Sequence, residues 1–478
     1  MNRDDFTFFR NIDQNLNNKF AYLDNAASSQ TPDMVISAMD EYYHSYRANI
    51  HRGVYAMSER ASTAYDEVRN SLANMIGANS EDIILTAGST LSSNMLIYML
   101  EQYIKWDEGD SKEKKESNDS IITTYYEHNS IAVPLIELSK RKNLQLKYID
   151  HSHINKEYKL IYNEALGKAE KKEVINSVDS KIRTENDLKM KSILADKNDT
   201  RHKASLEILE MWSKILDENV KIINMTMASN VTGEIFDIEA HINTINKICK
   251  EKNIKRPFII SDATAMLGHH RINVQSVDVD AMWAGGHKMC GPTGVGMLYI
   301  KRDISRRMSP HIYGGGMVSK VTEYDAQYRS DIMAFEAGTA NISGIIGWGA
   351  AIKYIESIGL KNIEAHIKDL HNYALEEMSA LPYLKLYTSD SDYNVGIISF
   401  SIFKDVSQKE KIRIHPHDIA HILSDNGVAV RAGHHCAPIY MNFINQIALT
   451  RASIYFYNTK EDIDMLIQGI EKAWKKLG

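Results

Sequence analysis

Short runs of hydrophobic residues alternate with segments of helical periodicity along most of the chain. Continuous apolar runs are typical of buried strands, whereas apolar residues repeating every three or four positions are typical of amphipathic helices. The runs predict strands at 20–23, 82–86, 121–124, 220–225, 257–260, 395–400 and 428–431. The periodic segments predict helices that begin near 32 and occupy 58–77, 91–98, 238–250, 346–358, 362–379, 416–424 and the chain beyond 460.

Strands that alternate with helices predict an α/β fold with a mainly parallel sheet covered on both faces. In such sheets, ligands bind outside the carboxyl ends of the strands. Four polar side chains lie at or just beyond predicted strand ends: His128, Asn230, Asp262 and Lys288. We therefore expect these side chains to line one crevice.

The change of pattern along the chain predicts two domains. We expect a large domain over 21–350 and a smaller α+β domain formed by 351–478 together with 1–20. Between 151 and 205, Lys, Glu, Asp and Asn dominate and apolar periodicity is poor. This composition predicts a solvated insertion that is partly helical or disordered.

Composition narrows the class of protein. The chain has 478 residues, of which 44% are hydrophobic and 25% charged, and its net charge is −6. These values are ordinary for a globular enzyme and do not favour nucleic acid or a membrane as a partner. The three cysteines, Cys249, Cys290 and Cys436, are too few for a disulfide framework and favour a cytoplasmic location. No signal peptide or bilayer-spanning run is expected.

A single lysine, Lys288, occupies a glycine-rich loop between the apolar runs 277–283 and 297–300. Two strands joined by this loop would hold the amine at a fixed place. Buried lysines are rare unless they are paired or chemically employed. The alternative is a surface hairpin that carries a solvated lysine.

The predicted strand 82–86 is followed by Gly88-Ser89-Thr90 and then by a helix. Free backbone N–H groups and hydroxyls at such a helix start form an anion site that suits phosphate. The alternative is an N-cap by Ser89 or Thr90 that needs no ligand.

These features together suit pyridoxal phosphate. Lys288 could form a Schiff base, and Asp262 could keep the pyridine nitrogen protonated so that the ring accepts electrons. His128 could stack on the flat ring, and the turn at Ser89 could bind the phosphate. The combination is much more specific than any one member.

The sequence resembles class V aminotransferase-fold enzymes, specifically the group II (SUF-type) cysteine desulfurases and selenocysteine lyases. The resemblance covers nearly the whole chain except the insertion at 151–205. It rests on motifs at 22–28, 49–53, 127–130, 229–233, 286–296, 335–339, 431–438, 451–453 and 457–459, which occur in the order of that family.

The resemblance implies pyridoxal-phosphate fold type I and a set of cofactor contacts. Lys288 would hold the cofactor covalently and move protons at the substrate α-carbon. Asp262 would pair with the ring nitrogen, His128 would stack on the ring and Asn230 would reach the ring oxygen. The implied phosphate contacts are Ser89, Thr90, His287 and Thr339, the last donated by the partner subunit of a homodimer.

The resemblance also implies how the substrate, L-cysteine, is handled. Arg451 would clamp its carboxylate, a task suited to a bidentate guanidinium. Asn25, Ala27 and His51 are further implied substrate contacts. Cys436 would attack the substrate sulfur, leaving alanine and an enzyme persulfide for a SUF-type acceptor protein in iron–sulfur cluster assembly.

Two other interpretations of Cys436 are an inert buried thiol and a metal ligand together with His434, His435, His415 and His417. Adjacent His-His-Cys residues do not supply the separated ligand pairs that are usual for zinc. No metal is therefore expected. Attack by Cys436 requires a thiolate on a mobile or exposed loop, and neighbouring Gly433 is consistent with one.

Four positions depart from the family pattern. Ala265 stands where a glutamine is usual, and Gly285 stands where a serine is usual. Ser89-Thr90-Leu91 replaces the common threonine, threonine and glutamate. Each lost contact would cost about 0.5–1.5 kcal/mol of cofactor binding. Two alternative functions follow: a selenocysteine or other cysteine C–S lyase, and a divergent, weakly active assembly or binding component.

Overall fold

The structure is a computed structural model that describes residues 3–16, 20–106, 117–152, 200–404 and 413–478. The chain divides into two compact units. The larger unit comprises Met1–Asp150, Asn219–Glu239 and Pro257–Gly478, and the smaller comprises His151–Glu218 and Ala240–Arg256.

The larger unit contains a seven-stranded sheet with the order β2-β8-β7-β6-β5-β3-β4. From β4 to β7 every pairing is parallel, whereas β8 is antiparallel to both β7 and β2. The predicted α/β class and mainly parallel sheet are therefore confirmed. The strands are β2 (Ile83–Thr86), β3 (Ser120–Thr124), β4 (Gln145–Ile149), β5 (Val220–Asn224), β6 (Phe258–Asp262), β7 (Ala281–Gly285) and β8 (Gly296–Ile300).

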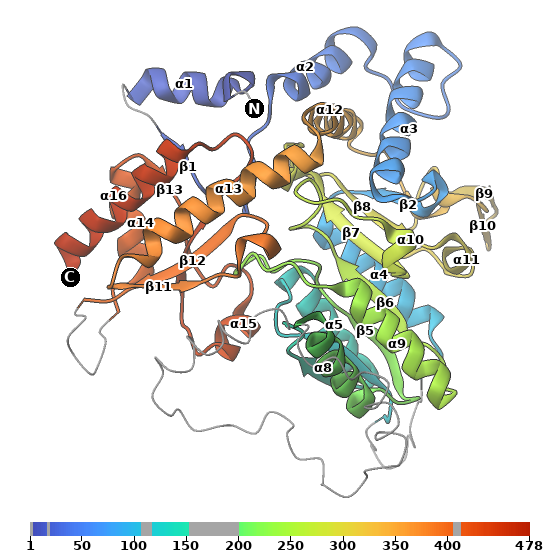
Figure 1. Cartoon of the computed structure of the whole chain (residues 1–478). Coiled ribbons are helices and arrows are strands. Elements are labelled where there is room, and N and C mark those ends of the chain that lie inside the picture. The colour runs from blue at the N-terminus through green and yellow to red at the C-terminus, as the bar shows by residue number, and fades with distance from the viewer. Residues whose placement is uncertain (1–2, 17–19, 107–116, 153–199, 405–412) are drawn as a thin grey trace, which may run out of the picture. The chain divides into compact units, whose positions relative to one another are not determined.

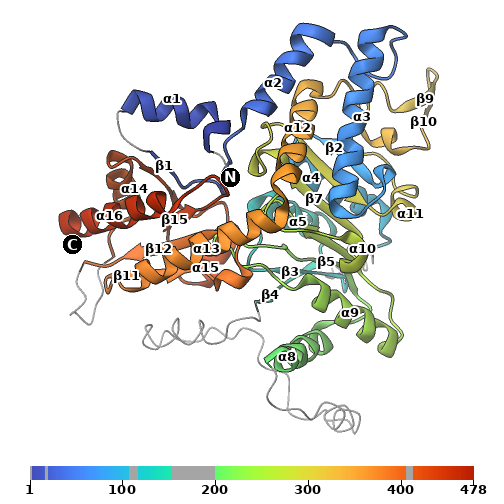
Figure 2. The same cartoon turned by 45° about the horizontal axis from the view of Figure 1, so that its top comes forward.

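Helices α4 (Ser89–Tyr103) and α5 (Asn129–Lys142) pack on each other and share one hydrophobic core with this sheet (Figure 1). Ile84, Met99, Leu135 and Trp283 are fully buried in that core. Figure 2 shows α12 running beside α2 and α3. The further helices here are α2 (Asp33–Glu41), α3 (Ala56–Ile76), α10 (Val274–Val277), α11 (Arg302–Ser305) and α12 (Ile342–Ile358).

The C-terminal part of the larger unit has a second core. It contains an antiparallel sheet in the order β11-β12-β15-β14, with α13 and α16 in contact along it (Figure 1). Phe400, Ile419 and Leu466 are fully buried there. The elements are β11 (Leu384–Tyr387), β12 (Ile397–Ile402), β14 (Arg431–Gly433), β15 (Leu449–Ser453), α13 (Leu360–Ser379), α14 (Pro416–Asp425), α15 (Pro438–Phe443) and α16 (Lys460–Leu477).

The N-terminal segment joins this second core. Strand β1 (Ala21–Tyr22) pairs in parallel with β13 (Val428–Ala429), and α1 (Thr7–Leu16) precedes it. Ala21 and Leu23 are buried among the C-terminal residues. The predicted strand at 428–431 is thus divided, because β13 pairs with β1 whereas β14 pairs with β15. The domain boundaries at 21 and 350 stay a prediction.

Two features were not expected from the hydrophobic pattern. Strand β4 carries polar residues at alternate positions, Gln145 and Lys147, and so lacks a continuous apolar run. Strands β9 (Val318–Val321) and β10 (Ala326–Tyr328) form an antiparallel hairpin whose residues are mostly exposed. Neither has the burial that produces a clear sequence signal.

The smaller unit contains α8 (Thr200–Ile215) and most of α9 (Ile238–Lys252). Within it, Trp212 Nε1 donates a hydrogen bond of 2.9 Å to His241 Nδ1. The insertion predicted at 151–205 lies largely outside the described residues. Across the residues that are described, no helix is long and apolar enough to cross a membrane.

The parallel strands deliver the predicted polar residues to one edge of the sheet. His128 follows β3 and caps α5, and Asn230 follows β5. Asp262 is the last residue of β6, and Lys288 lies three residues beyond β7. Because these four strands are parallel, their carboxyl ends lie at the same edge of the sheet.

Candidate active site

Lys288 ends a single 3-10 turn, η4 (Gly286–Lys288), directly after β7. Its side chain is 8% exposed, so the alternative of a solvated hairpin lysine is wrong. Burial lowers the pKa of the Lys288 amine to about 8; Arg451 lowers it further and Asp262 opposes the shift. A lowered pKa increases the share of neutral amine, which is the nucleophilic form.

His128 and Asp262 lie close to this amine. Burial and the Lys288 charge lower the pKa of His128 to about 4, so its ring is neutral near pH 7. The Ser130 backbone N–H donates to His128 Nδ1 at 3.0 Å, which leaves the ring proton on Nε2. Asp262 is 5% exposed, and its Oδ1 accepts a 2.8 Å hydrogen bond from Thr264 N. A neutral imidazole and a buried carboxylate therefore flank the lysine.

Cys436 is exposed on the loop between β14 and α15. Both His435 and Cys436 adopt left-handed backbone conformations, with φ of 54° and 55°. Such residues are uncommon outside glycine and persist where surrounding contacts hold them. Here Asn129 N donates to Cys436 O at 2.8 Å, and Asn230 Nδ2 donates to His435 O at 2.7 Å. The loop is thus fixed beside His128, and the inert buried interpretation of Cys436 is wrong.

Arg451 is buried on β15 with an exposure of 2%. Its guanidinium donates to Asn230 O at 2.7 Å and lies 3.4 Å from Asp24 Oδ1. Burial lowers the pKa of Arg451 to about 10, Asp24 opposes this, and Arg431 adds to it. Arg451 Nε has no hydrogen-bond partner among the described residues. An incoming carboxylate would find a buried guanidinium whose partner carboxylate, Asp24, is shared with Arg431.

The start of α4 lies beside the lysine loop. Gly88 holds the N-cap position with φ of 131°, and no side chain caps the helix. The alternative of an N-cap by Ser89 or Thr90 is therefore wrong, and the first backbone N–H groups of α4 have no capping side chain. Ser89 is 9% exposed, and Thr90 is exposed beside it. Burial lowers the pKa of His287 to about 4, with Lys288 contributing, so this neighbour is neutral as well.

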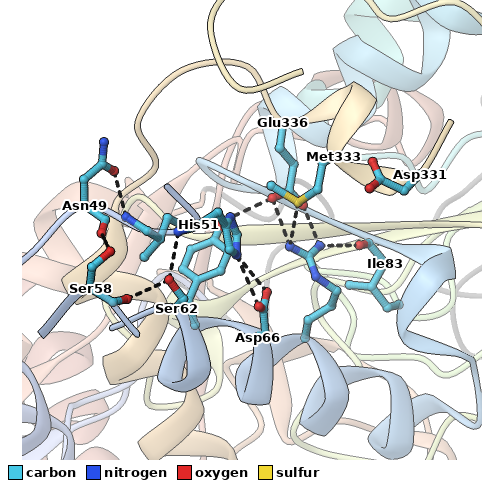
Figure 3. A network of polar contacts seen from close by, with 12 residues as sticks. Asn49, His51, Ser58, Ser62, Asp66, Ile83, Asp331, Met333 and Glu336 are labelled. Carbon is cyan, nitrogen blue, oxygen red and sulfur yellow. Dashed lines mark hydrogen bonds and ion pairs between the residues drawn. The ribbon is translucent and has the colours of Figure 1, made fainter. Parts of the chain in front are cut away.

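Two predicted site residues lie elsewhere in the larger unit. Thr339 and His51 line a cavity of about 800 Å³ that also contains Arg69 and Glu336. Figure 3 shows His51 paired with Asp66. The residues lining this cavity do not include Lys288, Asp262, His128 or Arg451. Within one chain the structure therefore does not bring His51 and Thr339 to the lysine.

Asn25 is 2% exposed, and its amide is bonded within the protein. Nδ2 donates to Ser453 O at 2.6 Å and to Asn458 Oδ1 at 3.0 Å, and Oδ1 accepts from the Tyr457 hydroxyl. Asn25 thus links the N-terminal segment to the C-terminal chain. Ala27 is partly buried in the adjoining turn, where its N–H donates to Asp24 O at 3.0 Å.

The residues present fit pyridoxal phosphate. Asn230 Oδ1 is buried without a hydrogen-bond partner among the described residues, so it can accept from a ring hydroxyl. The start of α4 offers backbone N–H groups and the Ser89 hydroxyl to a phosphate. Asp262 can pair with a ring nitrogen, His128 can stack, and Lys288 can bond to an aldehyde. Among the described residues there is no group of three or more His, Cys, Asp or Glu side chains that could hold a metal ion.

Comparison with known proteins agrees with this fold. The family model for aminotransferase class-V matches residues 21–173 and 183–466, so the chain belongs to that family, whose enzymes use pyridoxal phosphate. The chain is 34% identical to a probable cysteine desulfurase from Staphylococcus epidermidis, covering 97% of this chain and 94% of that protein. It is 30% identical to a cysteine desulfurase from Haloferax volcanii, covering 95% and 89%.

Solved structures agree with this fold. The apo structure of a cysteine desulfurase from Thermococcus onnurineus NA1 aligns with a TM-score of 0.75 and 29% identity, covering 98% of each chain. A cysteine desulfurase from Escherichia coli aligns with a TM-score of 0.74 and 22% identity, covering 100% of this chain and 98% of that one, and supports the fold alone.

The sequence assigned no role to Glu127, a buried carboxyl group that is near enough to Asp262 to be affected by its charge. Glu127 is 1% exposed, and its Oε1 accepts from Thr124 Oγ1 at 2.7 Å and Thr226 N at 3.0 Å. Burial raises its pKa to about 7; Asp262 adds to the shift, and these hydrogen bonds oppose it. Its sequence signal was its place in the motif 127–130, directly before His128, but that motif gave it no role.

Replacing Glu127 with glutamine should change how stability depends on pH. The folded pKa lies above the unfolded value, so the native state holds the proton more tightly and loses stability as pH rises from about 4.5 to 7. Glutamine does not titrate. Relative to the wild type, E127Q should gain up to about 3 kcal/mol across this window, measured by denaturation at several pH values. The exposed control E137Q should show no such gain; a difference for E127Q that is constant with pH would contradict the prediction.

Proposed function

We propose that this protein is a pyridoxal-phosphate-dependent cysteine desulfurase that converts L-cysteine to L-alanine and holds the sulfur as a persulfide on Cys436. The observation that carries the proposal is the grouping of buried Lys288 with Asp262 at the carboxyl ends of neighbouring strands. Asn230 adds two further groups to it, because it accepts a hydrogen bond from Arg451 and donates one to His435, the residue before Cys436. Relatives named as cysteine desulfurases, matched over nearly the whole chain, support it.

Each residue of the site would have a separate role in the reaction. Bound pyridoxal phosphate supplies an aldehyde that bonds to amines and a ring that accepts electrons. Lys288 exchanges a proton at the substrate α-carbon, and Arg451 binds the substrate carboxylate in a bidentate manner. Asp262 would pair with the ring nitrogen and favour its protonated form, and neutral His128 would stack on the ring.

The sulfur transfer balances without an outside oxidant. The Cys436 thiolate attacks the substrate sulfur, so an S–S bond forms as the C–S bond breaks. The carbon keeps the electron pair of the C–S bond and gains a proton, which completes alanine. The persulfide carries the transferred sulfur, and exposure of Cys436 gives an acceptor protein access to it.

We further propose that the enzyme works in the cytoplasm as a homodimer and passes sulfur to a SUF-type acceptor for iron–sulfur cluster assembly. Thr339 and His51 line a cavity that does not include Lys288. A two-fold partner offers a place for these residues at the opposite active site, because a symmetric interface presents the same patch from both subunits. This accounts for the family-like motifs around both residues.

The test is Cys436→Ala in purified protein loaded with cofactor. Alanine release from L-cysteine should fall close to background, whereas the visible absorbance of the lysine-bound cofactor should persist. Cys249→Ala, which removes a buried thiol on α9, is the matched control and should keep its activity. Alanine release that survives C436A would refute the proposed sulfur transfer.

A further inference from the structure

A side chain at position 285 would need the space that the Ser89 side chain occupies at the expected phosphate end of the site. Gly285 is the last residue of β7, and Ser89 is the first residue of α4. A Cβ atom on Gly285 would lie 2.8 Å from Ser89 Oγ and 3.1 Å from His287 Nδ1. Real Cβ atoms do not approach other atoms as closely as the first of these distances. The Ser89 hydroxyl therefore occupies the place that a side chain at 285 would need.

Thr264 fixes the direction of that hydroxyl. Thr264 Oγ1 donates to Ser89 Oγ at 2.9 Å, and Thr264 N donates to Asp262 Oδ1 at 2.8 Å. A hydroxyl has one proton and two lone pairs. Because Ser89 Oγ accepts from Thr264, its own proton is left to donate elsewhere, at a helix start where no side chain caps the backbone N–H groups.

We propose that Thr264 is a positioning residue for the cofactor phosphate: it orients Ser89 as a hydrogen-bond donor to the phosphate, in the space that Gly285 leaves open. The inference rests on the pyridoxal-phosphate site of the proposed function. It explains how the chain keeps a buried hydroxyl beside His287 although residue 285 has none. Thr264 itself need not touch the cofactor; it acts through Ser89.

Thr264→Val removes the donor and keeps the shape of the side chain. Apo protein should bind pyridoxal phosphate roughly 3- to 10-fold more weakly, as expected for one lost hydrogen bond. Binding of pyridoxal, which lacks the phosphate, should be unchanged. Thr264→Ser restores the donor and should bind both ligands within about twofold of the wild type. The readout is the dissociation constant of each ligand, measured by fluorescence titration.

The outcomes separate this inference from the proposed function. Equal weakening of both ligands by T264V, or no weakening of either, overturns the role of Thr264 while the cofactor site stands. Failure of the wild-type apo protein to bind pyridoxal phosphate overturns both. Thermal denaturation of each apo variant accompanies the titrations, and an unchanged melting temperature shows that the fold is retained.

The collision between a side chain at position 285 and Ser89 Oγ can be tested separately. Gly285→Ser should weaken pyridoxal phosphate binding, because the new side chain collides with Ser89 Oγ. Ser89→Ala should also weaken it, because a donor is lost. The double variant S89A/G285S removes the oxygen that collides and supplies a hydroxyl from residue 285, so it should bind more tightly than G285S alone. A double variant that binds more weakly than both single variants would overturn the inference.

Discussion

Replacement of Lys288 with alanine should lower alanine release from L-cysteine by on the order of 10³-fold or more, because a residue that both bonds to the cofactor and moves protons acts in several steps. The structure gives Lys288 the properties that this requires: burial, a pKa lowered to about 8, and Asp262 and Arg451 nearby. Borohydride treatment should fix the cofactor to the wild type at Lys288 and should fix none to K288A.

The same lysine gives this prediction a pH signature. With a pKa of about 8, roughly a tenth of the Lys288 amines are neutral at pH 7. The rate of covalent cofactor attachment to apo protein should therefore rise about tenfold from pH 6 to 7 and level off above pH 8. An ordinary lysine would not level off until above pH 10. A label on any lysine other than Lys288, or a rate that keeps rising beyond pH 9, would contradict this assignment.

Glu336→Ala should destabilise the protein by about 3–5 kcal/mol, because it leaves a buried arginine without its charge partner. Arg69 and Glu336 side chains are only 6% and 7% exposed, and Arg69 Nη1 lies 2.6 Å from Glu336 Oε1. Glu336 Oε1 also accepts from Leu85 N at 2.7 Å, and Arg69 donates to Ile83 O, so the pair ties α3 to β2 (Figure 3).

Chemical denaturation followed by tryptophan fluorescence measures this loss, and an exposed ion pair provides the control. Glu137 and Lys140 are 49% and 65% exposed, so water screens this ion pair and E137A should cost far less stability than E336A. Glu336→Gln keeps a hydrogen-bonding group near Leu85 N and should fall between the two. A loss of stability in E336A no larger than that in E137A would contradict the prediction, because it would mean that other groups stabilise the buried Arg69 charge.

The sequence predicted the centre of the site better than its surroundings. Asp262 ends a buried strand, and Lys288 and His128 lie just beyond two others, and such strand ends are well marked by hydrophobic runs. Asp24 and Glu127 lie within the motifs 22–28 and 127–130, but they act on residues distant along the chain, Arg451 and Asp262, so the sequence assigned them no role. Their charges matter only after the chain folds.

The pairing of strands that are distant in the sequence was also not predicted. The strand at 428–431 was predicted as one run, but the chain changes partners within it, from β1 to β15. Thr264 also gave no signal, since a threonine two residues after an aspartate has many uses. Only the position of Ser89, on another element, shows what its hydroxyl does.

The pairing of β1 with β13 has a consequence for biosynthesis. Ala21 and Leu23 are synthesised long before their core partners Val428, Ile454 and Leu466, because these residues lie far apart in the sequence. The second core therefore cannot be completed until these later residues have been made, and its apolar N-terminal strand stays unpaired until then. Long-range closure of this kind slows folding and exposes unpaired strand edges to aggregation. Truncation after β13 should leave a chain that depends on chaperones to stay in solution.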